Sequence, residues 1–231
     1  MNKAPRISAN KLAEFMTAKS ARQRQILRDQ KYPSDFKGMY YKEAAEAIAR
    51  CIASNLEDVS VLANTIGALS QSTATKIGTR RRIDANIDAL ETFQTMLDDV
   101  ALENVEANLG AHSSQRLVIQ GIEVSVRPEI TLAGQSKKGG ALIGGIKLHF
   151  PRTFSLDDDA AGYVSALVQE WCRQNRADEG LPHGPHCYVI DVGAKRVCSG
   201  VRSTAARMRD IEAACRNIAA LWPSIRENGD G

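Results

Sequence analysis

The stretch from Val126 to Phe150, VRPEITLAGQSKKGGALIGGIKLHF, decides the fold because it joins two strand-like runs through a polar, glycine-rich turn. The two runs are expected to pair as a β-hairpin around the turn at residues 135–140. Residues two apart share one face of a strand. Gly145, Lys147 and His149 are therefore predicted on one face of the second run, opposite a bulky apolar face.

The run before the turn alternates over residues 122–132 and is predicted to be one strand. Four polar residues would then share one face of that strand: Glu123, Ser125, Arg127 and Glu129. If the hairpin forms, this face meets the polar face of the second strand. Glu123 and Glu129 are then expected close to Lys147, although a hairpin with one solvated face gives the same alternation of charges.

Away from this stretch, the hydrophobic period changes near Gly110. Before it, apolar residues recur at helical spacing, which predicts helices over residues 11–18, 20–30, 41–54, 56–70 and 74–108. After it, the pattern predicts strands over 116–120, 122–132, 187–192 and 196–200, another strand ending at Phe150, and helices over 155–175 and 204–221. Ser8 and Ser155 are expected to cap the helices that follow them.

These patterns predict an α+β protein in which an N-terminal helical region, residues 1–110, precedes an α/β domain, residues 111–231. The C-terminal domain is expected to contain a mixed sheet flanked by helices. A chain of 231 residues with 43% hydrophobic residues can bury such a core without metal or disulfide bonds.

The composition points to a soluble, cytoplasmic protein. No apolar run approaches the roughly 20 residues that span a bilayer. The five cysteines are widely spaced and form no C-x-x-C pair, as expected of reduced thiols rather than of a disulfide framework or a zinc site. His183, His186 and Cys187 lie close in sequence, but without a second ligand cluster they favour a loop role over a metal site.

The predicted polar face has the residue types used in phosphodiester hydrolysis. Carboxylates hold Mg²⁺ through oxygen ligands, and a lysine can orient the attacking water. On this reasoning Glu129, Lys147 and Glu123 are the candidate catalytic residues, and Glu129 and Glu123 are the candidate Mg²⁺ ligands on this face. Lys147 interrupts a run of bulky apolar residues. It is therefore a stronger candidate for a functional residue than a typical surface lysine.

With Pro128-Glu129 on one strand and Lys147 on the next, the chain resembles the restriction-endonuclease-like, or PD-(D/E)XK, nuclease superfamily. The resemblance implies a restriction-endonuclease-like fold and a Mg²⁺-dependent activity on DNA, with an acid-x-Lys triplet on the second strand. Gly145 stands where that triplet has its acid. The resemblance therefore implies that a second acid comes from elsewhere, from Glu123, Glu106 or Asp191.

Two further segments, ILRDQKYP at residues 26–33 and DIEAAC at residues 210–215, resemble uncharacterised proteins of bacterial mobile elements and defence islands. This resemblance implies a role in phage defence or mobile-element maintenance. The sequence leaves open two alternatives to an active nuclease. One is a degenerate nuclease fold that binds nucleic acid or a partner protein, and the other is a scaffold protein with no nucleic-acid role.

Clusters of basic residues give DNA binding independent support. The net charge of +3 is too small to indicate a nucleic-acid partner, so local clusters matter more. Six residues are the candidate phosphate contacts: Arg80, Arg81, Arg82, Lys137, Lys138 and Arg202. Each cluster alone is also typical of a solvated face. An aromatic content of 5% argues against base stacking on single strands as the main binding mode.

Overall fold

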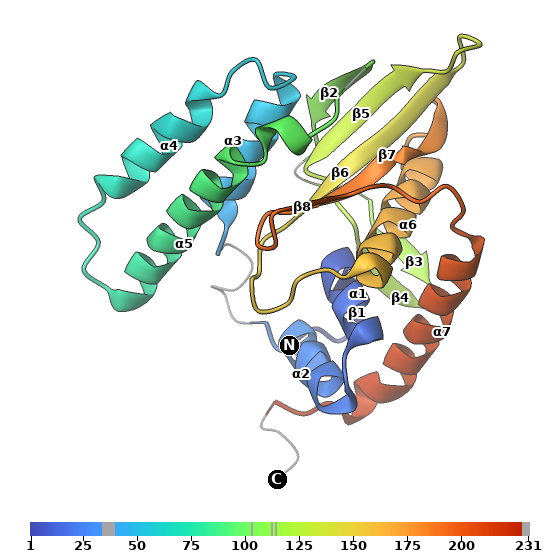
Figure 1. Ribbon diagram of the computed structural model, residues 1–231. Helices are drawn as coiled ribbons and strands as arrows, with labels where there is room; N and C mark the ends of the chain where they lie inside the picture. Colours follow the sequence, from blue (N-terminus) through green and yellow to red (C-terminus); the bar gives the residue numbers. More distant parts are fainter. Residues whose placement is uncertain (34–39, 103, 112, 114, 228–231) are drawn as a thin grey trace.

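The computed structural model describes residues 1–33, 40–102, 104–111, 113 and 115–227. The chain folds as an α+β protein with mixed sheets flanked by helices, as predicted (Figure 1). The helices are α1 (Ala9–Thr17), α2 (Ser20–Lys31), α3 (Lys42–Ala53), α4 (Ser60–Ser70), α5 (Ile77–Gln94), α6 (Asp158–Asn175) and α7 (Ala205–Leu221). The strands are β1 (Arg6–Ser8), β2 (Val105–Leu109), β3 (Leu117–Ile119), β4 (Ile122–Ser125), β5 (Ile130–Gln135), β6 (Ala141–His149), β7 (Leu181–Asp191) and β8 (Arg196–Cys198).

The larger sheet has five strands in the order β2-β5-β6-β7-β8. The hairpin predicted around residues 135–140 is confirmed, because β5 and β6 pair antiparallel with Ile130 opposite Ile146. Strand β2 joins β5 antiparallel, whereas β6 and β7 are parallel and are connected through α6. Strands β2, β5, β6 and β7 are thus neighbours in the sheet, although β3 and β4 of the small sheet come between β2 and β5 in the chain.

The prediction of one strand over residues 122–132 is wrong. Residues 122–125 form β4, which pairs with β1 and β3 in a second, three-stranded sheet, and β5 begins only at Ile130. Between them, Arg127 adopts a positive φ of 40°, and Pro128 has no N–H to continue a ladder. The chain therefore turns out of one sheet into the other, and Glu123 and Glu129 do not share a strand face.

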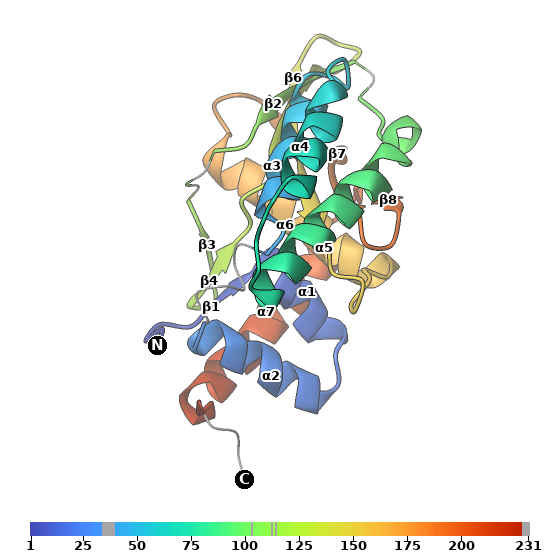
Figure 2. The same cartoon turned by 90° about the vertical axis from the view of Figure 1, so that its left-hand side faces the viewer.

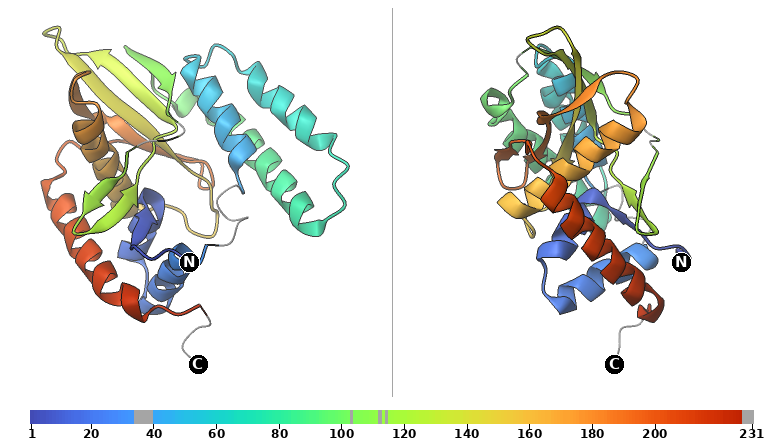
Figure 3. Two further views of the ribbon diagram at one scale, coloured as in Figure 1. Left: turned by 180° about the vertical axis from the view of Figure 1, so that it is seen from behind. Right: turned by 90° about the vertical axis from the view of Figure 1, so that its right-hand side faces the viewer.

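Helices cover both faces of the five-stranded sheet. On β7, Cys187 and Val189 belong to one hydrophobic core, whereas Tyr188 and Ile190 belong to the other. The first core also contains α1, α2, α6, α7 and the small sheet, and the second contains α3, α4 and α5. Figure 2 shows α3, α4 and α5 in front of the sheet, and Figure 3 shows α6 and α7 on the other side.

Several helix boundaries differ from the sequence prediction, and α4 and α5 begin at Ser60 and Ile77 rather than at residues 56 and 74. Helix α5 ends at Gln94 rather than near residue 108, because a 3₁₀ turn at Leu97–Asp99 follows it and the chain then enters β2. Helix α6 is capped by Asp157, whose side chain accepts a hydrogen bond from the Ala160 N–H, and not by Ser155. The predicted cap at Ser8 is confirmed by its contact with the Lys11 N–H.

Residues 1–110, predicted as a helical region, also supply β1 to the small sheet and β2 to the large one. Both sheets therefore contain strands from either side of the expected boundary. His183, His186 and Cys187, for which a loop role was expected, lie within β7 instead. Among the described residues, no helix combines the length and apolar character needed to cross a membrane.

Candidate functional site

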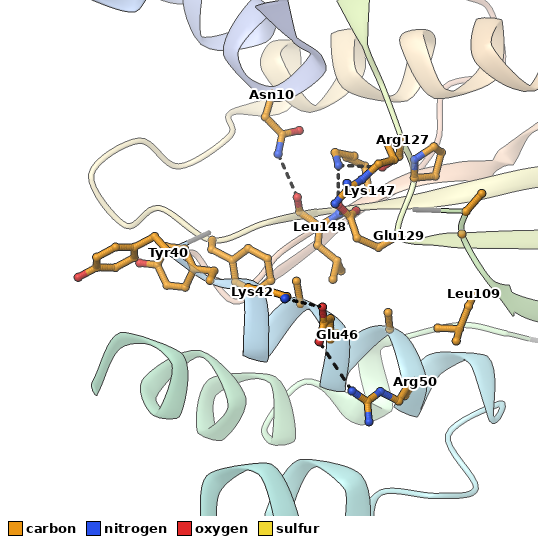
Figure 4. A pocket seen from close by; sticks show the side chains of 17 residues that line it. Asn10, Tyr40, Lys42, Glu46, Arg50, Leu109, Arg127, Glu129, Lys147 and Leu148 are labelled. Atoms are coloured by element: carbon orange, nitrogen blue, oxygen red, sulfur yellow. Dashed lines mark hydrogen bonds and ion pairs between the residues drawn. The ribbon is translucent and has the colours of Figure 1, made fainter. Parts of the chain in front are cut away.

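A cavity of about 590 Å³ lies between α3 and the part of the large sheet where β5 begins and β6 ends. Its floor is formed by Glu129, Lys147 and Leu148, and one face of α3 forms the opposite wall (Figure 4). We call this cavity the α3 cleft. It has the size of a site for a small ligand or for one unit of a polymer.

The floor of the cleft holds a lysine–glutamate pair. Lys147 Nζ lies 2.5 Å from Glu129 Oε1 and 3.0 Å from the carbonyl oxygen of Arg127. The other carboxylate oxygen, Glu129 Oε2, accepts a hydrogen bond from the Leu148 N–H at 2.8 Å. With side chains only 11% and 17% exposed, the two charges compensate one another in a partly desolvated position.

Local backbone geometry explains this placement. Ile130 pairs with Ile146, and the Glu129 N–H donates to the Ile146 carbonyl, so Glu129 and Lys147 meet across the start of the hairpin. The positive φ of Arg127 belongs to the same turn, and it is the carbonyl of Arg127 that accepts from Lys147. The turn that separates Glu123 from Glu129 therefore also supplies the second acceptor for the lysine.

The opposite wall carries three charged side chains of α3, Lys42, Glu46 and Arg50, at intervals of four residues. Glu46 lies 3.9 Å from Lys42 and 3.8 Å from Arg50, and all three side chains are between 37% and 58% exposed. Ion pairs this long and exposed contribute little to stability. Lys42 and Arg50 can therefore turn toward an anion in the cleft at small cost.

The lining as a whole favours anions. Arg127 also borders the cleft, so its charged residues are the cations Lys42, Arg50, Arg127 and Lys147 and the carboxylates Glu46 and Glu129. A groove with excess positive charge and low-dielectric walls concentrates negatively charged ligands. Cationic side chains of this kind can bind phosphate or carboxylate groups through charge-assisted hydrogen bonds.

Aromatic residues border the other end of the cleft. The rings of Tyr41 and Phe150 stack with centroids 5.0 Å apart, and the edge of Tyr40 contacts Tyr41 at 5.1 Å. Burial, together with the neighbouring Tyr40, raises the pKa of Tyr41, so its hydroxyl stays protonated near neutral pH. This end of the cleft is therefore uncharged and apolar.

The other predicted carboxylates lie outside the cleft. Glu123, on β4 of the small sheet, forms an exposed ion pair with Arg116. Glu106, on the edge strand β2, accepts a hydrogen bond from Asn108 at 3.1 Å. Asp191 is fully buried and accepts from the N–H groups of Leu156 and Ala194, which is the structural role of a strand-end carboxylate.

Gly145 occupies the position where the resemblance implies an acid, and its surroundings are tight. A Cβ atom at this position would lie 3.1 Å from Pro128 Cβ and 3.1 Å from the Ile130 carbonyl oxygen. A larger side chain would require the Pro128 ring to shift. The neighbouring strand thus fills the space that an acid at position 145 would need.

The predicted basic residues are distributed over three places. Arg80, Arg81 and Arg82 lie on α5, where Arg82 pairs with Glu43 of α3 and the Arg81 carbonyl accepts from Tyr40 at 3.2 Å. Lys137 and Lys138 are exposed at the β5–β6 turn, and Arg202 is exposed between β8 and α7. The α5 cluster is therefore joined to the aromatic end of the cleft.

Sequence reasoning missed the α3 wall and Asn10, although the i, i+4 charges of α3 were visible. Charges at this spacing are also typical of a solvent-exposed helix face. In the part of the chain that the structure describes, no three His, Cys, Asp or Glu residues are grouped to hold a metal ion. The cleft nevertheless offers Glu129 and Glu46, and Mg²⁺ commonly binds through one or two carboxylates while keeping several waters.

No protein-family model and no curated protein matches the sequence, so the function is argued from the geometry of the site.

Proposed function

We propose that this protein acts on DNA through the α3 cleft and has a restriction-endonuclease-like core. The observation that carries the proposal is the Glu129–Lys147 pair, held with little exposure at the floor of a cleft whose lining has more cations than carboxylates. The order β5-β6-α6-β7 supports the resemblance, because a glutamate directly before β5 and a lysine on the antiparallel neighbour β6 precede a helix and a parallel strand.

In the active form of this proposal, Glu129 and Glu46, the two carboxylates that line the cleft, would hold Mg²⁺. Glu46 takes the place expected for Glu123 or Glu106, which lie elsewhere. When bound, the metal would polarise a phosphoryl oxygen. Lys147 orients the attacking water beside Glu129, and Lys42 and Arg50 contact the flanking phosphates.

A second candidate is DNA binding without cleavage. It is favoured by the two hydrogen bonds already made to the Glu129 oxygens and by the closed space at Gly145. Either function fits a cytoplasmic role in phage defence or mobile-element maintenance, in which a partner protein can complete the complex. The five buried, unpaired cysteines are consistent with a reducing compartment.

The decisive experiment is a cleavage assay on linear, nicked and single-stranded DNA with Mg²⁺ or Mn²⁺. We expect activity in the wild type, a loss of about a hundredfold or more in Lys147→Met and Glu129→Gln, and a smaller loss in Glu46→Gln. Glu123→Gln is the matched control, because it removes an equal charge from an exposed ion pair outside the cleft. Undiminished cleavage by Lys147→Met would reject the proposed site.

Binding measurements then distinguish the remaining functions. DNA binding that weakens with salt and with Lys147→Met, but without cleavage by any form, supports the second candidate. The absence of both binding and cleavage removes both nucleic-acid functions and leaves the scaffold role.

A further inference from the structure

We infer that the α3 cleft takes an unpaired nucleotide, from single-stranded DNA or an opened end, rather than an intact duplex. The inference rests on the proposed function and specifies its substrate. A cavity of about 590 Å³ falls within the range of small-molecule sites, which accommodates one nucleotide-sized unit. A duplex would lie across the mouth of the cleft and leave Lys147 at its floor out of reach.

The aromatic end supplies a surface for a base. Phe150 stacks on Tyr41, and Tyr40 continues the group outward with 36% of its surface exposed. The Tyr40 hydroxyl donates to the Arg81 carbonyl at 3.2 Å, which holds the outer ring in place. A fixed, partly exposed tyrosine at the border of a cationic cleft is suited to stacking on a nucleobase.

The low aromatic content of the whole chain does not indicate that aromatic rings lie together at one end of the cleft. The sequence has five tyrosines and five phenylalanines, and three of these rings meet at one end of the cleft. The average composition argues against stacking, whereas the folded chain assembles a local stacking surface from the two residues before α3 and the residue after β6.

Asn10 is a second, independent feature of the cleft. Its Nδ2 donates to the Leu148 carbonyl at 3.0 Å, which fixes the side chain. Its Oδ1 is buried and, among the residues that the structure describes, has no hydrogen-bond partner. A buried acceptor without a partner is unfavourable, and the N–H groups of a base edge are donors that would satisfy it.

The charges complete the recognition of a nucleotide. Figure 4 shows Tyr40 at one end of the cleft and the Glu129–Lys147 pair toward the other, while the cations of the α3 wall run from Lys42, nearer to Tyr40, to Arg50, farther from it. A base on Tyr40 therefore directs its sugar and phosphate along a row of cations. Stacking at one end and charge along the wall is the combination used by proteins that bind single strands.

The test compares two labelled probes of identical sequence and about ten nucleotides in length, one single-stranded and one a blunt duplex. Binding is measured by fluorescence anisotropy without a divalent metal, and a 2-aminopurine base reports stacking through its quenching. The variants are Tyr40→Ala, Tyr40→Phe, which keeps the ring but loses the bond to Arg81, and Lys147→Met. Val118→Ala is the control, since Val118 is 69% exposed on the small sheet.

We expect the single strand to bind more tightly than the duplex and to quench 2-aminopurine. Tyr40→Ala should weaken this binding by about tenfold or more and abolish the quenching, whereas Tyr40→Phe and Val118→Ala should stay within about twofold of the wild type. Equal loss in Tyr40→Phe and Tyr40→Ala would assign the effect to the Arg81 contact and overturn the inference.

The test also separates this inference from the proposed function. If the duplex binds as well as the single strand, and binding depends on Lys147 but not on Tyr40, the inference fails while the function stands. If neither probe binds to the wild type, the inference fails, and the proposed function fails with it when the cleavage assay with Mg²⁺ or Mn²⁺ is negative too.

Discussion

At the scale of single residues, the structure of the cleft depends on how the positive charge of Lys147 is compensated. Its ammonium group has two acceptors, and Glu129 in turn accepts from Lys147 and from a backbone N–H. Removing one member of such a pair leaves the other with little access to water and without its partner, which is more costly than removing both.

We therefore expect Lys147→Met to lower the free energy of unfolding by about 2 to 3 kcal/mol. The double variant with Glu129→Gln should recover at least half of that loss, because the neutral amide still accepts from the Leu148 N–H. Urea-induced unfolding measures both values. A double variant as unstable as Lys147→Met alone would contradict the explanation, and Glu123→Gln should change stability by less than about 1 kcal/mol.

His149 provides a prediction about pH. Burial lowers its pKa, outweighing the hydrogen bond to the Phe154 carbonyl and the nearby Asp191 carboxylate, which act in the opposite direction. The unfolded chain therefore binds a proton at higher pH than the folded protein does. The resulting stability is complete above about pH 6.5 and is lost as the pH falls toward the folded pKa.

Unfolding experiments between pH 7 and pH 5 should show this loss. In His149→Gln, the slope of the unfolding free energy against pH should be smaller. The difference should correspond to up to about one bound proton. The NMR titration of the His149 ring gives the folded pKa directly. A midpoint at or above the ordinary histidine value would rule out the stated cause.

Some residues of the cleft could be predicted from the sequence and others could not. Glu129 and Lys147 were predictable as neighbours because they face each other at the start of one hairpin, where alternation and pairing suffice. Glu123 was misplaced because alternation assumes an unbroken strand, and the positive φ of Arg127 breaks it. Nothing in the letters VRPE other than the proline indicates that turn.

At the scale of elements, strand β6 is buried from Ile143 to His149 and lies between β5 and β7. A Cβ at Gly144 would lie 2.2 Å from the His186 carbonyl oxygen, where the β6–β7 register is irregular. The absence of a side chain at Gly144 therefore allows β7 to approach β6 closely.

Gly144→Ala should accordingly lower the free energy of unfolding by about 2 kcal/mol or more, because the two strands must separate locally. Gly67→Ala is the matched comparison: it lies within α4, nothing stands within 4 Å of its added Cβ, and it should raise stability by about 0.5 to 1 kcal/mol. Thermal and urea unfolding measure both. Equal effects would refute the role assigned to Gly144.

The helices were easier to predict than their ends. Five helices before Gly110 were expected and five were found in the described part of that segment. The helical spacing of apolar residues can be recognised within each short stretch of sequence, without knowledge of distant contacts. The end of α5 was misjudged, since Leu97, Val100 and Val105 continue a helical spacing while the chain is already turning into β2. Only pairing with β5, a long-range interaction, decides that residues 105–109 form a strand.

At the scale of the whole molecule, the two sheets and both cores combine segments from either side of Gly110. A fragment of residues 111–231 would lack β1, β2, α1 and the α3–α5 layer. We expect it to show no cooperative unfolding transition by circular dichroism, because both faces of its sheet would lose apolar cover. A cooperative transition in the fragment would establish it as an independent domain.

The cysteines give a second measurement at this scale. All five are buried and unpaired, and burial raises the pKa of Cys215 to about 12. We expect a thiol reagent at about pH 8 to label the native protein only as fast as it opens, and to label all five thiols rapidly in urea. Prompt labelling of a cysteine in the native protein would show that its core opens locally.

The turn at Arg127 connects distant parts of this architecture mechanically. Strand β4 ends two residues before it and is held by β1, near the beginning of the chain. Pulling the small sheet outward would draw the Arg127 carbonyl away from Lys147 and leave the ammonium with one acceptor. The pairing of β1 with β4 therefore helps to keep the Arg127 carbonyl in place for Lys147, and loss of that pairing would leave the ammonium to Glu129.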